Sequence, residues 1–329
     1  MKIYKKIFNF LFRIALSVAL LAWLYTKIDI KSTKDILYSA DIGYILCSLA
    51  VFFIVNVILI GRWFVFMNAL ELDPSFMRAI RYYLAGLFGN LFLPSAIGGD
   101  IIKILGMCKD SDQKPKIVAS VILDRLSGFA SIVLVAFCSF MLGRKYMQGT
   151  HLIVPIMTMG GASLVIALIL FNHSVFEFIC RVFNFFPKIK NALMSLHDNI
   201  SLMKNKKVEG MKAILLSCLS QIVYASTFFL SAKALHQDIS FIYFLIFVPI
   251  ICVAASFPSI GGLGVREAGA AFLFSKVGIG SGVAVSLSLL SFLFMVVVGL
   301  LGGIFYVSTL SSGRVQHHSP DAASGQPEA

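Results

Sequence analysis

The chain has 329 residues, of which 58% are hydrophobic and 13% are charged, and its mean hydropathy is +0.89. Soluble domains carry about 25% charged residues, so this composition excludes a soluble protein and predicts an integral membrane protein. The net charge of +12 fits the basic loops that membrane proteins keep on the cytoplasmic side. Because the basic residues are spread over many loops, without a basic domain, we expect no nucleic-acid binding.

Six apolar stretches are long enough to cross a bilayer, which takes about 20 apolar residues in a helix. They are 7–26, 44–68, 117–142, 152–172, 211–235 and 281–309. The first follows a basic start that resembles a signal peptide, but no clear cleavage site follows, so we interpret it as a retained span. Two further apolar regions, 79–107 and 241–279, are each interrupted by a Pro-Ser-Gly segment.

Basic loops predict the orientation of these spans. Lysines at the N-terminus, basic residues on both flanks of 79–107 and basic residues in the loop 173–210 indicate the cytoplasmic side. Region 79–107 then enters and leaves on the same side, as a re-entrant hairpin, and 241–279 does so from the opposite side. Arg144 and Lys145 in an outer loop argue against this assignment, and the alternative is that both regions cross fully.

The expected fold is therefore an all-α polytopic membrane protein, with about six full spans and two oppositely oriented broken hairpins that resemble an inverted repeat. We expect one membrane domain over 1–310, in a bacterial or archaeal cytoplasmic membrane, with both termini in the cytoplasm. Apolar residues recur at helical spacing within 173–210, which predicts amphipathic helices on the cytoplasmic leaflet. The tail 311–329 is polar, and we expect it to be disordered.

The two interruptions are near-copies of each other. Pro94 and Ser95 precede Gly98-Gly99-Asp100, and Pro258 and Ser259 precede a segment that contains Gly261, Gly262, Gly264, Arg266 and Glu267. Proline and paired glycines break a helix, and broken backbone at membrane depth is tolerated only where protein buries it or where it lines a cavity. Matching breaks in two halves of a membrane protein point to the binding site of a transporter.

Charged residues gather near these breaks, although each is costly at bilayer depth. Each break opens a helix, whose N-terminus attracts anions. Together with Lys103, Arg125 and Arg266, the two helix starts predict a pocket for a lipid phosphate between the hairpins. The candidate binding residues are Gly98, Gly99, Asp100, Lys103, Asp124, Arg125, Gly261, Gly262, Gly264, Arg266 and Glu267.

A purely structural interpretation stays open for each of these residues. Asp100 could cap its helix with Lys103 beside it, Glu267 could do the same, and Arg266 could pair with Asp124 or Glu267. Arg62-Trp63 is ambiguous as well, because both residue types favour the membrane boundary.

Motifs for metal, nucleotide or covalent chemistry are missing from the sequence. The six cysteines occur singly, so we expect neither a zinc site nor a disulfide framework. No G-x-x-x-x-G-K-S/T or H-E-x-x-H segment is present, and Ser95 and Ser259 have no histidine nearby in the sequence. We therefore expect no cofactor, no metal and no catalytic residue, and a protein that is not itself an enzyme.

Over about residues 7–310 the sequence resembles the membrane domain of lysylphosphatidylglycerol synthase/flippase proteins. The resemblance rests on Arg62-Trp63, Leu93-Pro94, Gly98-Gly99-Asp100, Lys103, Asp124-Arg125 and the segment from Pro258 to Glu267. The family often has Arg where Lys103 stands and Glu where Asp124 stands. It implies movement of modified lipids between leaflets, whereas the aminoacyl transfer of the family belongs to a soluble domain that this sequence does not show.

The leading hypothesis is a lipid translocator whose partners are membrane lipids. The alternatives are the membrane subunit of a lipid-head-group transferase, a scaffold for a membrane glycosyltransferase or another lipid-modifying enzyme, and an ion carrier. Homo-oligomerisation stays open. The lipid, the direction and the driving force do not follow from the sequence.

Overall fold

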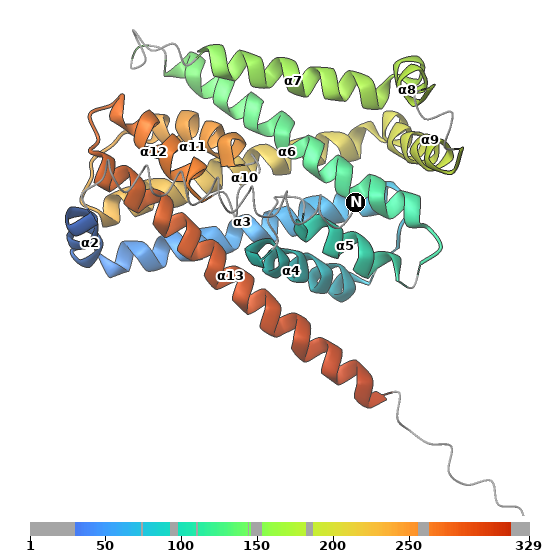
Figure 1. Cartoon of the computed structure of the whole chain (residues 1–329), viewed down its shortest axis with the longest axis horizontal. Helices are drawn as coiled ribbons and strands as arrows, with labels where there is room; N and C mark the ends of the chain where they lie inside the picture. Colours follow the sequence, from blue (N-terminus) through green and yellow to red (C-terminus); the bar gives the residue numbers. More distant parts are fainter. Residues whose placement is uncertain are drawn as a thin grey trace, which may run out of the picture.

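The computed structural model describes residues 30–73, 75–92, 98–109, 111–143, 145, 153–181, 187–255 and 263–316, and all regular structure in these ranges is helical (Figure 1). In chain order the helices are α2 (Ile30–Tyr38), α3 (Ile42–Ala69), α4 (Phe76–Phe92), α5 (Gly98–Cys108), α6 (Lys114–Leu142), α7 (Ile153–Phe171), α8 (His173–Cys180), α9 (Pro187–Ser201), η3 (Leu202–Asn205), α10 (Lys207–Ala234), α11 (Phe241–Ala255), α12 (Val265–Ser275) and α13 (Ser281–Gln316).

Five of the described helices are long and apolar enough to cross a membrane: α3, α6, α7, α10 and α13. They coincide with five of the six predicted spans, and the first predicted span, 7–26, lies outside the described residues. The chain is therefore a polytopic all-α membrane protein, as the composition predicts. Helix α13 continues to Gln316, past the predicted start of the tail at 311, because extending an existing helix needs no new nucleation.

The two interrupted regions form helical hairpins in which α4 packs on α5 and α11 packs on α12. Helices α5 and α12 have 11 residues each. At a rise of 1.5 Å per residue each is about 16 Å long, roughly half of the hydrocarbon core. This length favours the re-entrant interpretation over two complete crossings.

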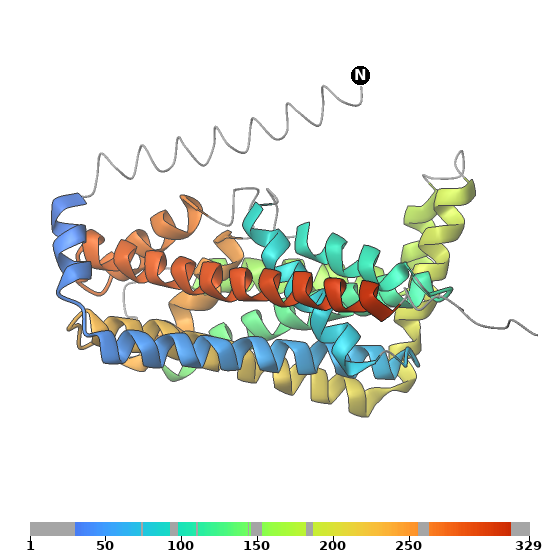
Figure 2. The ribbon, with the colours of Figure 1, turned by 90° about the horizontal axis from the view of Figure 1, so that it is seen from below.

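The two hairpins enter the bundle from opposite ends. Helix α3 ends, and α6 begins, at the end of the long axis where α4 and α5 lie (Figure 1, right). Helix α10 ends, and α13 begins, at the other end, beside α11 and α12, and the view from below agrees (Figure 2). The inverted arrangement that the sequence predicts is therefore present in the fold.

Small polar side chains hold the long helices together. Ser48 of α3 donates a hydrogen bond of 2.7 Å to the carbonyl oxygen of Thr227 in α10, and its hydroxyl lies 3.0 Å from that of Ser231. Hydroxyl contacts of this kind join helices in a bilayer, where burying apolar surface provides little driving force. Helices α3 and α10 thus form an antiparallel pair, on which α11 of the second hairpin packs through α10, whereas α4 of the first hairpin packs mainly on α13.

Glycines bring α13 against α4. A Cβ atom added at Gly302 would lie 2.8 Å from the carbonyl oxygen of Leu84, and one added at Gly303 would lie 2.5 Å from the ring of Phe88. The backbones therefore approach more closely than any side chain would allow, as in other small-residue helix contacts in membranes.

The connector 173–210 forms helices, as predicted, and these pack on α6 and α7. Two of its residues, Phe176 and Ile200, are buried against the bundle, whereas Phe178 is 70% exposed. Buried His197 of α9 stacks on Phe176 with ring centroids 4.5 Å apart, and His173 lies 5.3 Å away. Burial, and then the neighbouring His173, lower the pKa of His197 below its usual value of 6.5.

We predict that Gly302→Ala lowers the stability of the protein in detergent by about 1–3 kcal/mol, because the new methyl group meets the backbone of α4. Gly61→Ala in α3 is the matched control, since a Cβ atom there meets nothing within 4 Å. Alanine favours a helix more than glycine does, so Gly61→Ala should leave the melting temperature unchanged or raise it. Equal melting temperatures of the two variants would contradict the close α4–α13 contact.

We also predict that acid weakens the connector through His197. Because its pKa is lowered in the fold, the unfolded chain binds more protons below about pH 6.5, and stability falls as the pH drops through that window. His197→Phe should remove this part of the pH dependence of the melting temperature. His236→Asn, at an exposed position, serves as the control and should keep it.

Candidate functional site

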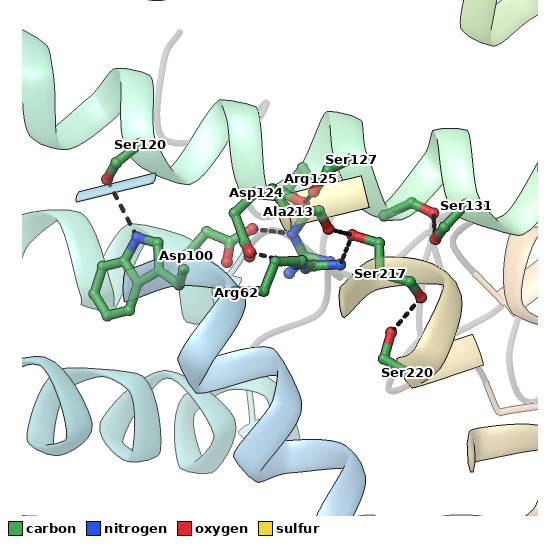
Figure 3. A network of polar contacts seen from close by, with 12 residues as sticks. Arg62, Asp100, Ser120, Asp124, Arg125, Ser127, Ser131, Ala213, Ser217 and Ser220 are labelled. Atoms are coloured by element: carbon green, nitrogen blue, oxygen red, sulfur yellow. Dashed lines mark hydrogen bonds and ion pairs between the residues drawn. The ribbon is translucent and has the colours of Figure 1, made fainter. Parts of the chain in front are cut away.

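A cluster of five charged side chains lies between α3, α5, α6 and α10, and Figure 3 shows four of them, Arg62, Asp100, Asp124 and Arg125. Its members are Arg62 of α3, Asp100 and Lys103 of α5, and Asp124 and Arg125 of α6. Four of them are buried, and the side chain of Arg125 is 43% exposed. The structure thus brings together the predicted residues Asp100, Lys103, Asp124 and Arg125, and it adds Arg62.

Arg62 and Asp124 form one half of this cluster. The Arg62 Nε donates to the Asp124 carboxylate at 2.6 Å, and Nη1 donates to the hydroxyl of Ser217 in α10 at 3.2 Å. Gly128 leaves room for the guanidinium, since a Cβ atom there would lie 3.3 Å from Nη1. Arg62 is therefore a buried link between three helices, α3, α6 and α10.

Asp100 is shared by two cations. Its Oδ2 accepts a hydrogen bond of 2.5 Å from Arg125 Nε, and its Oδ1 lies 3.4 Å from Lys103 Nζ. Lys103 Nζ also lies over the rings of Tyr83 and Trp63, 4.4 and 5.4 Å from their centroids. Such cation–π contacts stabilise a buried ammonium group that has only part of a carboxylate as its partner.

The charges of the cluster do not cancel. Its three cations, Arg62, Lys103 and Arg125, face two carboxylates, Asp100 and Asp124, which leaves one positive charge in excess. Buried charges are usually paired, because desolvating an unpaired ion is costly. One additional negative charge would complete this cluster.

The start of α5 is held by a residue that the sequence analysis did not single out. Asn90 of α4 accepts a hydrogen bond of 2.8 Å from the backbone N–H of Gly99. A Cβ atom at Gly99 would lie 2.2 Å from the carbonyl oxygen of Gly86, so α4 and α5 meet through two glycines. The carboxylate of Asp100 is thereby left to bind Arg125 instead of capping α5. An asparagine within an apolar run was the available signal.

A cavity of 780 Å³ lies beside the cluster, between α5, α6 and α7, with the start of α10 at one side. Asp100 and Arg125 supply the charged part of its wall, and most of the remaining wall is apolar. The apolar side chains include Phe66, Ile104, Val121, Ile122, Leu126, Phe129, Ile166, Leu170, Phe171 and Ile214. A cavity of this size with one charged corner suits an amphipathic ligand.

The second hairpin carries a separate cluster. Arg266 Nη2 donates to the Glu267 carboxylate at 2.9 Å, and its Nε donates to the hydroxyl of Ser288 in α13 at 2.8 Å. The other carboxylate oxygen of Glu267 accepts the backbone N–H of Gly264 at 2.6 Å, and both charged side chains are buried. Gly264 has φ +85°, which favours glycine.

This second cluster matches the structural alternative for its residues. Glu267 caps α12, and Arg266 pairs with Glu267 and not with Asp124. One cation and one carboxylate leave no excess charge, and the ion pairs of each cluster are internal to it. The arrangement therefore supports a ligand site at the first hairpin more than one shared by both helix starts. Pro94, Ser95, Pro258, Ser259, Gly261 and Gly262 lie outside the described residues.

The fold and this site define a polytopic membrane protein with two inverted helical hairpins and a buried charge cluster beside a largely apolar cavity. The chain belongs to the family described as the lysylphosphatidylglycerol synthase TM region, whose model matches residues 10–303.

Two archaeal proteins are similar over most of the chain. The UPF0104 membrane protein PH1989 of Pyrococcus horikoshii is 26% identical, over 91% of this chain and 96% of its own length. A UPF0104 membrane protein of Methanothermobacter thermautotrophicus is 22% identical, over 76% of this chain and 80% of its own length. No solved structure matches the chain.

We predict that breaking the Arg62–Asp124 pair from one side destabilises the protein strongly. Arg62→Met leaves the Asp124 carboxylate buried without its partner, which typically costs about 3–5 kcal/mol. The double variant Arg62→Met/Asp124→Leu should recover most of this loss in the melting temperature. Lys206→Met, which breaks an exposed pair with Glu71, should cost less than about 1 kcal/mol. A double variant as unstable as Arg62→Met would contradict the pairing.

Proposed function

We propose that this protein binds a phospholipid with one negative charge in the cavity between α5, α6 and α7, and moves it between the leaflets of the membrane. The observation that carries the proposal is the single excess positive charge of the cluster, at the wall of a 780 Å³ apolar cavity. A phosphodiester supplies the one negative charge that this cluster lacks.

Arg125 is the residue we assign to the phosphate. It lines the cavity, its side chain is 43% exposed, and a guanidinium binds phosphate oxygens in a bidentate manner. Lys103 is buried against Trp63 and Tyr83, and Arg62 is bound to Asp124 and Ser217. Of the three cations in the cluster, Arg125 thus has the most direct access to a ligand in the cavity.

The apolar wall suits an acyl chain, and α7 separates this space from the surrounding lipid. One face of α7 lines the cavity with Ile166 and Leu170, whereas Met157 and Leu164 are 58% and 62% exposed. The helix packs on α6, α8 and α9. Only 6% of the residues in its apolar 18-residue stretch are buried. A helix with so few buried residues can move aside at low cost, which would admit a lipid from the bilayer.

Two inverted hairpins are the architecture of transporters that expose a site alternately to the two sides. The family description names a phosphatidylglycerol derivative, so phosphatidylglycerol is the first lipid to test. Its headgroup carries one negative charge, which matches the excess charge of the cluster.

We predict that proteoliposomes with the full chain flip fluorescent phosphatidylglycerol faster than zwitterionic phosphatidylcholine, as measured by dithionite quenching. Arg125→Gln should slow phosphatidylglycerol flipping about tenfold, because it removes the cation that meets the phosphate. Arg125→Lys should retain part of the rate, since the charge remains but bidentate binding is lost. Arg181→Gln, at an exposed position at the end of α8, is the matched control and should flip at the wild-type rate. Wild-type flipping by folded Arg125→Gln would refute the assignment.

A further inference from the structure

In the proposed anion site, Asp100 and the ligand would both bind Arg125. In the structure Arg125 is bound to the Asp100 carboxylate at 2.5 Å, yet Arg125 is also the cation that faces the cavity. A phosphate that binds Arg125 side-on, through Nε and one Nη, competes with Asp100, because Asp100 is bound by the same Nε. The carboxylate is only 4% exposed, so losing its partner would leave a buried charge uncompensated.

Lys103 lies close enough to Asp100 to serve as its partner in place of Arg125. It lies one helical turn from Asp100 on α5, and its Nζ is 3.4 Å from Oδ1. That oxygen is buried and has no hydrogen bond within the part of the chain that the structure describes. One carboxylate oxygen is therefore hydrogen-bonded to Arg125, while the other forms a longer ion pair with Lys103 and no hydrogen bond.

The aromatic residues around Lys103 stabilise its positive charge without neutralising it. The ammonium group lies over the rings of Tyr83 and Trp63, which hold a cation without neutralising it. Gly86 makes space for the lysine stem, since a Cβ atom there would lie 3.0 Å from its Cγ and 3.1 Å from its Cε. A lysine side chain is flexible, so a small rotation is enough to shorten the 3.4 Å distance between Nζ and Oδ1 to that of a hydrogen bond.

Resting on the proposed function, we propose that Lys103 is a positioning residue that replaces Arg125 as the partner of Asp100 when Arg125 binds the lipid phosphate. Lys103 does not touch the ligand itself. It lets the guanidinium leave Asp100 while the carboxylate stays ionised and paired. The lipid therefore binds without any change in the protonation of the site.

This role can be tested by measuring how many protons the protein takes up when the lipid binds. The titratable and charged groups around Asp100 are Lys103 on its own helix, Arg125 and Asp124 on α6, and Tyr83 on α4, with Arg62 behind Asp124. In Lys103→Met the remaining charges cancel, and Arg125 can leave Asp100 only if the carboxylate takes up one proton. In Lys103→Met/Asp100→Asn the excess of one positive charge returns, and no proton is needed.

The experiment is calorimetric titration of the purified full chain in detergent with dioctanoyl phosphatidylglycerol, in two buffers of different ionisation enthalpy. The wild type should bind with the same affinity at about pH 6 and about pH 8, without proton uptake. Lys103→Met should bind about tenfold or more weakly at about pH 8, recover at about pH 6, and take up one proton per lipid. Lys103→Arg and the double variant should each bind more tightly than Lys103→Met at about pH 8, without proton uptake. Melting temperatures check that each variant is folded.

The outcomes separate the two proposals. If the wild type binds no phosphatidylglycerol, the proposed lipid site fails, and the role of Lys103 fails with it. If the wild type binds but Lys103→Met is weakened equally at both pH values without proton uptake, Lys103 acts as a direct ligand or a structural residue, and only this inference is overturned. A double variant that binds as weakly as Lys103→Met at about pH 8 would also overturn it.

Discussion

The buried carboxylate of Asp100 is the constraint on which the organisation of the first half of this protein depends. An ionised carboxylate within a membrane domain needs a cation, and Asp100 has two within reach: Arg125 from α6 and Lys103 from its own helix. The second cation creates the excess charge, and the proposed function rests on that charge, because it favours an anionic ligand. Without Lys103 the cluster would be a neutral network that ties helices together.

Close backbone contact makes this arrangement feasible. Gly86 and Gly99 let α4 and α5 approach until no side chain fits between them, and Asn90 accepts the N–H of Gly99 at the start of α5. The carboxylate of Asp100 binds Arg125 of α6 instead of that N–H group. Gly99 therefore serves the packing of the first hairpin, and in the proposed function the charged residues that follow it bind the ligand.

Much of the fold could be predicted from the sequence, because the signals are local. Apolar runs locate the spans, and the repeated Pro-Ser-Gly segments predict where each interrupted region divides into two helices. The pairing of charges could not be predicted, since Asp100 pairs with a residue 25 positions away and Arg62 with one 62 positions away. Those pairs depend on which helix faces meet, and one sequence does not determine that. The cavity was missed for the same reason, because its wall combines α5, α6 and α7.

The two halves are inverted in space but differ in chemistry. Each has a short helix that begins at glycines and carries an acid and a base near its start. In the second half the acid caps its own helix, and the base is bound by that acid and by Ser288, so the charges cancel and their hydrogen bonds are internal. In the first half, Asn90 takes over the capping, the acid is shared by two bases, and one charge remains. Two short helices thus carry similar acid and base residues, and the difference in their pairing is why we propose a ligand site at the first and a structural role for the second. The matching motifs alone predict a pocket between the two hairpins. The excess charge of the first cluster instead favours a site at the wall of the cavity beside the first hairpin.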